Sequence, residues 1–221
     1  RVLQLGEQPK TVFLVGGLGV DNIMRTKLLN LTDLESSLGF KLNSKNLLIT
    51  FHPATLASGN AQNQMNELLN ALSHLKNTNL VFTLSNADTG GRQLIDLVNN
   101  FVLKHKNAHV FTSLGSQRYL SCIKYFDGVV GNSSSGLLEV PSFKKGTINI
   151  GGRQAGRLQA KSIINCEPNF VSIKAAIEKL YTDDFQKSLL TVNNPYGRGG
   201  ASEKIVNAIK KSHIQGAPQK E

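Results

Sequence analysis

Short apolar runs alternate with longer amphipathic segments along most of this chain of 221 residues. The runs have the length and composition of buried strands and span residues 11–15, 47–51, 80–84, 108–112, 128–131 and 147–150, with a weaker candidate at 162–165. Helical patterns separate them at residues 21–30, 63–76, 90–105, 117–125 and 137–143. Because strands joined by crossover helices pair in parallel, the alternation predicts an α/β fold with a doubly wound, Rossmann-like parallel sheet.

The last part of the chain is more helical. Periodic patterns predict helices at 170–180, 183–190 and 201–212, with a loop of Asn, Pro and Gly residues at 194–200. Further upstream, Thr32 and Glu35 have the spacing of a helix capping box. We expect disorder beyond Ile214, because residues 214–221 are polar and terminal. Neither a repeat nor a shift in composition marks a second domain.

The segment 129–157 carries the strongest functional signal. Its strand runs into the small polar turn 132–136, and a turn that opens a helix offers N–H groups, hydroxyls and a favourable dipole to an anion. One helical turn later, Glu139 can accept hydrogen bonds from two vicinal hydroxyls, which a ribose presents beside its diphosphate. The pattern predicts a nucleoside diphosphate site. A plain helix cap with a glutamate that complements the dipole is the structural alternative.

Three further polar residues follow predicted strands. His52 directly follows the run 47–51, Asn86 follows the run 80–84, and Arg153 follows the run 147–150. The carboxyl ends of parallel strands share one edge of the sheet, so these side chains are expected in the same crevice as the serine turn. Each also has an ordinary structural reading, as a loop-bonded histidine, a turn residue and a solvated arginine.

The composition limits which kinds of binding partner are expected. The formal net charge of +10 is compatible with nucleic acid as a partner, but the basic residues are scattered along the chain and aromatic residues make up only 6%. A phosphorylated small molecule accounts for the positive charge equally well. No apolar run reaches the roughly 20 residues of a membrane span.

Cys122 and Cys166 lack motif spacing, which predicts reduced thiols, a cytoplasmic location and no zinc site. The start at Arg1 suggests a fragment.

Several motifs in a fixed order carry a family resemblance. They occupy residues 51–53, 85–88, 90–92, 131–136 with Glu139, 152–154, 156–157 and 194–197. With these motifs the chain resembles the hydrolysing UDP-N-acetylglucosamine 2-epimerases over nearly its whole length. It is most similar to the branch that makes N-acetylmannosamine for sialic acid synthesis, or a diacetylated analogue for legionaminic-type sugars.

The resemblance implies a two-domain, glycosyltransferase-B-like fold of which this chain is the carboxyl-terminal half. Residues 1–9 would be the crossing from a missing amino-terminal domain, and residues 10–213 the UDP-binding, Rossmann-like domain. The residues that would contact the diphosphate are His52, Asn86, Ser133, Ser134 and Arg153. Glu139 would bind the ribose hydroxyls, and uracil would meet the backbone near Ser113 and Leu114.

The family reaction eliminates UDP from carbon 1 with loss of the carbon 2 proton and then adds water to the glycal, with no cofactor and no metal. The carboxylates that move protons would lie in the missing domain, so we expect this half to contain no catalytic residue and to bind UDP without turnover. Homodimers are common in the family, so a homodimer is expected. Two alternatives stay open, a retaining UDP-sugar glycosyltransferase of the same fold and a non-catalytic basic binding module.

Overall fold

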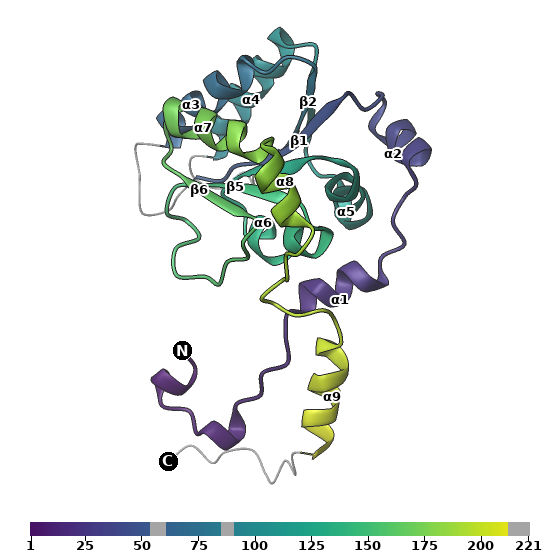
Figure 1. Cartoon of the computed structure of the whole chain (residues 1–221), viewed down its shortest axis with the longest axis vertical. Helices are drawn as coiled ribbons and strands as arrows, with labels where there is room; N and C mark the ends of the chain where they lie inside the picture. The colour runs from purple at the N-terminus through teal and green to yellow at the C-terminus, as the bar shows by residue number, and fades with distance from the viewer. Residues whose placement is uncertain (54–60, 85–90, 212–221) are drawn as a thin grey trace.

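Six parallel strands form the centre of the molecule. The computed structural model describes residues 1–53, 61–84 and 91–211, and its sheet has the order β3-β2-β1-β4-β5-β6 (Figure 1). The strands are β1 (Lys45–Thr50), β2 (Thr78–Thr83), β3 (Ala108–Phe111), β4 (Gly128–Gly131), β5 (Gly146–Ile150) and β6 (Ile163–Cys166). Every neighbouring pair is parallel. The predicted fold class is confirmed.

Most of the helices cover the two faces of this sheet. The helices are α1 (Leu18–Arg25), α2 (Leu31–Leu38), α3 (Ala61–Ser73), α4 (Gly91–Lys104), α5 (Gly115–Tyr125), α6 (Ser135–Leu138), α7 (Phe170–Leu180), α8 (Asp183–Leu189) and α9 (Ala201–Lys211). α1 and α9 contact each other and lie below the sheet in Figure 1. Three short 3-10 helices are η1 (Leu3–Leu5), η2 (Pro9–Thr11) and η3 (Val140–Phe143). No helix within the described ranges has both the length and the apolar content to cross a membrane.

The strand sequences explain the two covered faces. Side chains alternate between the faces of a sheet, so Leu47 and Ile49 pack toward the core shared with α3, α4 and α7. Leu48 points the other way, into the core shared with α2 and α5. All three are at most 1% exposed. A strand buried on both faces reads as a continuous apolar run, and this is why the sequence pattern located it.

The order of the strands creates a crevice. From β1 the chain builds outward to β2 and β3, and then returns through α5 to place β4 on the opposite side of β1. β1 and β4 are therefore neighbours whose connections leave in opposite directions. In open α/β sheets, this switch between strands is where ligands bind, beyond the carboxyl ends.

The prediction of a first strand at residues 11–15 is wrong. The segment ends η2 and continues as chain without regular structure away from the sheet, toward α1 (Figure 1). Phe13 and Leu14 are 55% and 98% exposed. An apolar run forms a strand only if a neighbouring strand pairs with its backbone, and none of the six described strands adjoins this segment.

Three helix predictions differ most from the structure. The helix expected over residues 21–30 begins at Leu18 and ends at Arg25, where the Thr26 backbone turns to an extended conformation at ψ 122°. Thr32 does not cap α2, since the Asn30 side chain accepts from the Asp33 N–H instead. The helix expected over residues 137–143 is divided into α6 and η3, because Pro141 cannot donate to an α-helical ladder.

A buried carboxylate connects the first helix to the last. Asp21 on α1 accepts hydrogen bonds from the N–H groups of Ala201 and Ser202, at 3.0 and 2.7 Å, and from the Ser202 hydroxyl at 2.6 Å. These bonds, the hydroxyl first, lower the pKa of Asp21 to about 2. These hydrogen bonds cap the amino-terminal end of α9 and hold α9 against α1.

Candidate functional site

The switch between β1 and β4 brings together residues that are 80 positions apart. His52 follows β1 and Asn132 follows β4. The Asn132 side chain accepts a hydrogen bond from the His52 N–H at 2.7 Å and donates one to the His52 carbonyl at 2.8 Å. At 2% exposed, Asn132 is effectively buried. The two bonds join the ends of the two strands and fix the place of the His52 backbone.

The same asparagine positions the arginine loop. Its backbone carbonyl accepts from the Arg153 guanidinium at 3.0 Å and from the Gln154 side chain at 2.7 Å. Gln154 is buried, whereas most of Arg153 is exposed. Burial, with the Arg153 charge as a second cause, lowers the pKa of His52. A neutral imidazole and a guanidinium thus lie beside each other at the edge of the sheet, a pair of donors suited to phosphate oxygens.

The serine turn follows β4 as predicted, but its helix is short. Ser133 and Ser134 precede α6, which is only four residues long, so little macrodipole is available. The Gly136 N–H is already donated to the Ser133 carbonyl at 3.2 Å. In the described part of the chain, no hydrogen bond uses the N–H groups of Ser133 and Ser134. Anion binding here depends on these amides, the hydroxyls and Arg153 more than on a helix dipole.

Glu139 lies one turn beyond, between α6 and η3. Its Oε2 accepts from the Ser135 hydroxyl at 2.7 Å, and that hydroxyl accepts from the Tyr119 hydroxyl at 2.8 Å. Its Oε1 lies beside the first turn of α1, 3.7 Å from where a Cβ at Gly19 would be. The glycine-rich segment 16–19 therefore packs against the carboxylate.

The remaining predicted residues lie at the same edge, farther from the switch. Ser113 is exposed after β3, while the Leu114 side chain is buried, so only its backbone is available to a ligand. Arg118 donates to the carbonyls of both residues, at 3.3 and 3.0 Å. Asn86 lies outside the described residues. The structure thus brings His52, Ser133, Ser134, Glu139 and Arg153 to the β1–β4 end and Ser113 and Leu114 to the β3 end of one edge.

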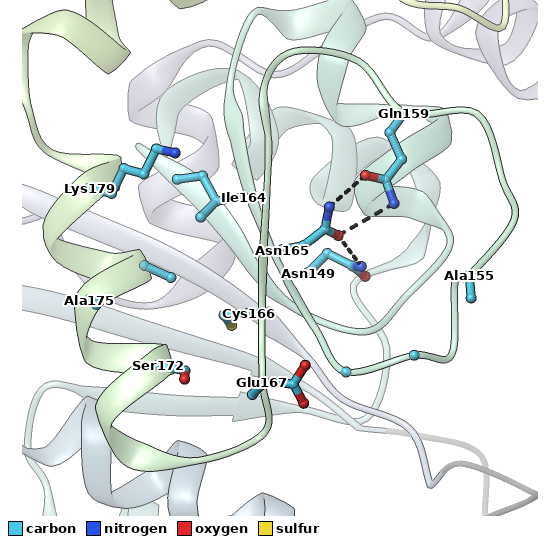
Figure 2. Close-up of a pocket in the computed structure, with 13 residues that line it drawn as sticks. Asn149, Ala155, Gln159, Ile164, Asn165, Cys166, Glu167, Ser172, Ala175 and Lys179 are labelled. Carbon is cyan, nitrogen blue, oxygen red and sulfur yellow. Dashed lines mark hydrogen bonds between the residues drawn. The ribbon is translucent and has the colours of Figure 1, made fainter.

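A separate cavity of about 700 Å³ lies around the edge strand β6. Figure 2 shows an amide chain on one side of it, in which Asn149 donates to Asn165 at 2.8 Å and Asn165 donates to Gln159 at 2.7 Å. None of the predicted site residues that the structure describes lines this space. It lies along the edge strand β6, two strands from β4, and ligands of such sheets bind at the strand switch, so we place the candidate site at the switch.

The geometry adds residues that sequence reasoning did not single out and gives new roles to two residues of the predicted turn 132–136. Arg118 orders the turn before α5, and Tyr119 contacts Ser135. Within the predicted turn, Asn132 connects the two strand ends and Ser135 holds Glu139. For Asn132, the signal available in the sequence was an asparagine directly after an apolar strand. Across residues 1–53, 61–84 and 91–211, no group of three or more His, Cys, Asp or Glu side chains is arranged to hold a metal ion.

Curated proteins of known name have sequences similar to this one. A curated Campylobacter jejuni protein named GDP/UDP-N,N'-diacetylbacillosamine 2-epimerase (hydrolyzing) is 42% identical over 213 residues, which are 96% of this chain and 55% of that protein. The Escherichia coli polysialic acid biosynthesis protein P7 is 39% identical, over 95% of this chain and 53% of that protein. The chain thus spans about half the length of the curated relatives it matches.

The fold has solved counterparts. A Staphylococcus aureus protein, MnaA, solved with UDP superimposes with a TM-score of 0.73 at 19% identity, over 95% of this chain and 56% of that one. At this identity the likeness supports the fold alone. The family model described as UDP-N-acetylglucosamine 2-epimerase matches residues 1–210. With nearly the whole chain matched, this protein belongs to the UDP-N-acetylglucosamine 2-epimerase family.

Proposed function

We propose that this chain is the nucleotide-binding half of a hydrolysing UDP-sugar 2-epimerase. The observation that carries the proposal is the cluster at the β1–β4 switch, where His52, the serine turn and Arg153 are joined through Asn132. The diphosphate would lie between Ser133, Ser134 and Arg153, with the His52 ring donating to it. Glu139 would accept from the ribose hydroxyls through Oε1.

The proposed reaction has two stages. The bond between sugar carbon 1 and the diphosphate oxygen breaks while a base removes the proton from carbon 2, giving a glycal and UDP. Water then adds, with hydroxide to carbon 1 and a proton to carbon 2, which reverses the configuration at carbon 2. Negative charge grows on the departing diphosphate, so the guanidinium of Arg153 and the serine hydroxyls would stabilise the transition state more than the substrate.

The substrate would be a UDP-linked N-acetylated amino sugar. The Campylobacter relative is named for a diacetylated sugar and the Escherichia relative for polysialic acid synthesis. We therefore propose UDP-N-acetylglucosamine or its diacetylated analogue, the product entering sialic-acid-type sugar synthesis. The cytoplasmic location and the absence of a nucleic-acid partner stay predictions.

A second domain would complete the site. The extended amino-terminal segment and α9 leave apolar side chains exposed, among them Leu14 at 98%, Leu5 at 86% and Ile209 at 54%. Large apolar side chains that are exposed in number are typical of an interaction surface. We propose that the missing half packs here and supplies the proton-transferring carboxylates. A protein of the relatives' full length should then bind much less of a fluorescent apolar dye per mole than this chain.

Calorimetric titration of UDP into this chain tests the binding role. Charge-assisted hydrogen bonds contribute about 1.5–3 kcal/mol, so Glu139→Gln should weaken UDP binding about 10- to 100-fold. Glu178→Gln, an exposed carboxylate on α7, is the matched control and should bind like the unaltered chain. Equal affinity in the Glu139 variant and the unaltered chain would remove the ribose role.

Activity separates the enzyme classes. A protein extended upstream to the relatives' length should release UDP from its sugar nucleotide and form the free 2-epimerised sugar, whereas these 221 residues alone should not. Transfer of the sugar to an acceptor would instead select the retaining glycosyltransferase. Strongly salt-dependent retention of oligonucleotides that UDP does not alter would select the basic binding module.

A further inference from the structure

The ribose carboxylate is held by a chain of two hydroxyls from another part of the fold. Tyr119 on α5 donates to Ser135 at 2.8 Å, and Ser135 donates to Glu139 Oε2 at 2.7 Å. An ionised carboxylate accepts hydrogen bonds and cannot donate them, and a serine has one proton to give. The direction of both bonds is therefore fixed, from the phenol to the serine and from the serine to the carboxylate.

The middle of the chain cannot shift easily. Ser135 begins α6, and the next residue, Gly136, packs so closely on β5 that an added Cβ would be 2.6 Å from Thr147 Cγ2. The Thr147 hydroxyl also donates to the Gly136 carbonyl at 2.8 Å. The backbone under Ser135 is thus held by the sheet, and Glu139 follows four residues later on the same side of the short helix.

The phenol is suited to remain a donor. Tyr119 is partly buried among the side chains that α5 packs on the sheet, and this burial above all raises its pKa to about 12. The Glu139 charge acts in the same direction. With Oε2 occupied by Ser135, the carboxylate has one defined orientation. Among the described residues, no hydrogen bond uses Oε1, which stays available to a ligand.

We propose that Tyr119 is a positioning residue for the nucleotide site, and that through Ser135 it orients Glu139 toward the ribose hydroxyls. The inference rests on the proposed UDP-binding function. In this proposal Tyr119 acts through Ser135 and not through a contact of its own with the nucleotide. Its contribution is to reduce the freedom of the carboxylate before the ligand arrives, which raises affinity without adding a contact.

The test is a set of calorimetric titrations with UDP and with 2′,3′-dideoxy-UDP, which lacks both ribose hydroxyls. Tyr119→Phe removes one hydroxyl and keeps the ring, and it should weaken UDP binding about five- to tenfold. The same variant should bind the dideoxy nucleotide as the unaltered chain does. In a Glu139→Gln background, the Tyr119 substitution should change the UDP affinity less than about twofold.

The controls separate positioning from folding. Tyr125→Phe removes a hydroxyl from the same helix and should leave both affinities unchanged. If Tyr119→Phe does not fold, Ser135→Ala interrupts the same chain and should show the same loss with UDP alone. Unchanged UDP binding in these variants, or equal losses for both nucleotides, would overturn the inference while the proposed function stands. If the unaltered chain does not bind UDP, the proposed function fails first and the inference with it.

Discussion

Replacing Asn132 by alanine should destabilise the whole fold and the site together. The side chain makes two hydrogen bonds to the His52 backbone, at 2.7 and 2.8 Å, in a place where only 2% of the residue is exposed. Alanine can form neither bond. The N–H and carbonyl of His52 would then lose their partners in a partly buried environment, and the ends of β1 and β4 would no longer be joined there.

The expected cost follows from these two bonds. Each contributes about 1 kcal/mol net, and leaving a buried partner unsatisfied adds to this, so we expect a loss of about 2–4 kcal/mol in the free energy of unfolding. A domain of this size has about 5–15 kcal/mol in total. Since 1 kcal/mol corresponds to about 2–4 °C for 150–250 residues, the Tm should fall by about 5–15 °C.

Urea and thermal unfolding followed by circular dichroism measure this loss. Asn99→Ala is the matched control, because Asn99 is exposed on α4, where alanine is the better helix former. The control should be as stable as the unaltered chain or slightly more so. A loss below about 0.5 kcal/mol for Asn132→Ala would refute the reasoning, since it would mean that the two strand ends do not depend on these bonds. In variants that fold, UDP affinity should also fall, because the Asn132 side chain places the His52 backbone.

Three further predictions concern backbone, charge and pH. Gly131 has φ +139°, and a Cβ added there would be 2.0 Å from the Thr50 carbonyl oxygen. Gly131→Ala should therefore lower the free energy of unfolding in urea by more than about 4 kcal/mol. The control Gly39→Ala, at φ +80° with open space around it, should lower this free energy by only about 1 kcal/mol. The pKa of Asp21 falls from its ordinary 3.8 to about 2 on folding, so its contribution to stability should be complete above about pH 4 and be lost as the pH falls toward 2. When the free energy of unfolding is measured against pH, Asp21→Asn should lack this part of the pH dependence. The free His52 has a lowered pKa that a bound diphosphate should raise. Since the terminal phosphate of UDP also exchanges a proton near pH 6.5, calorimetry in two buffers should detect more proton uptake in the unaltered chain than in His52→Asn, and equal uptake in both would contradict this.

The sheet was predictable because its strands leave a one-dimensional signal. A run such as 47–51 is apolar throughout, since neighbours cover it on both faces, and no knowledge of those neighbours is needed to see it. The run 11–15 has the same appearance and is not a strand. What separates the two is a pairing partner, which depends on the tertiary fold and cannot be read from five residues.

The edge that carries the site was predictable for a similar reason. Parallel strands all end on one side, so polar residues after strands had to gather there, and His52, Ser133 and Arg153 do. The connections among them were not predictable. Asn132 meets His52 across 80 residues, and Tyr119 meets Ser135 across 16, because the strand order β1–β4 and the return path of α5 place them together.

The helix after the serine turn illustrates a local effect that outweighed the periodic pattern. The spacing of apolar residues over 137–143 predicts one helix, and the structure has α6 and η3 with Glu139 at their junction. The interruption follows from Pro141, whose missing N–H favours a new turn at that point. Its consequence is functional, because an anion at this turn gains little from a four-residue helix and depends on Arg153 and the serines instead.

The most direct test of the central claim is a crystal structure of this chain with UDP. The account predicts the diphosphate at the end of β4, within hydrogen-bonding distance of Ser133, Ser134 and Arg153, and the ribose hydroxyls on Glu139 Oε1. Nucleotide bound only in the cavity around β6, or no bound nucleotide at saturating UDP, would contradict it.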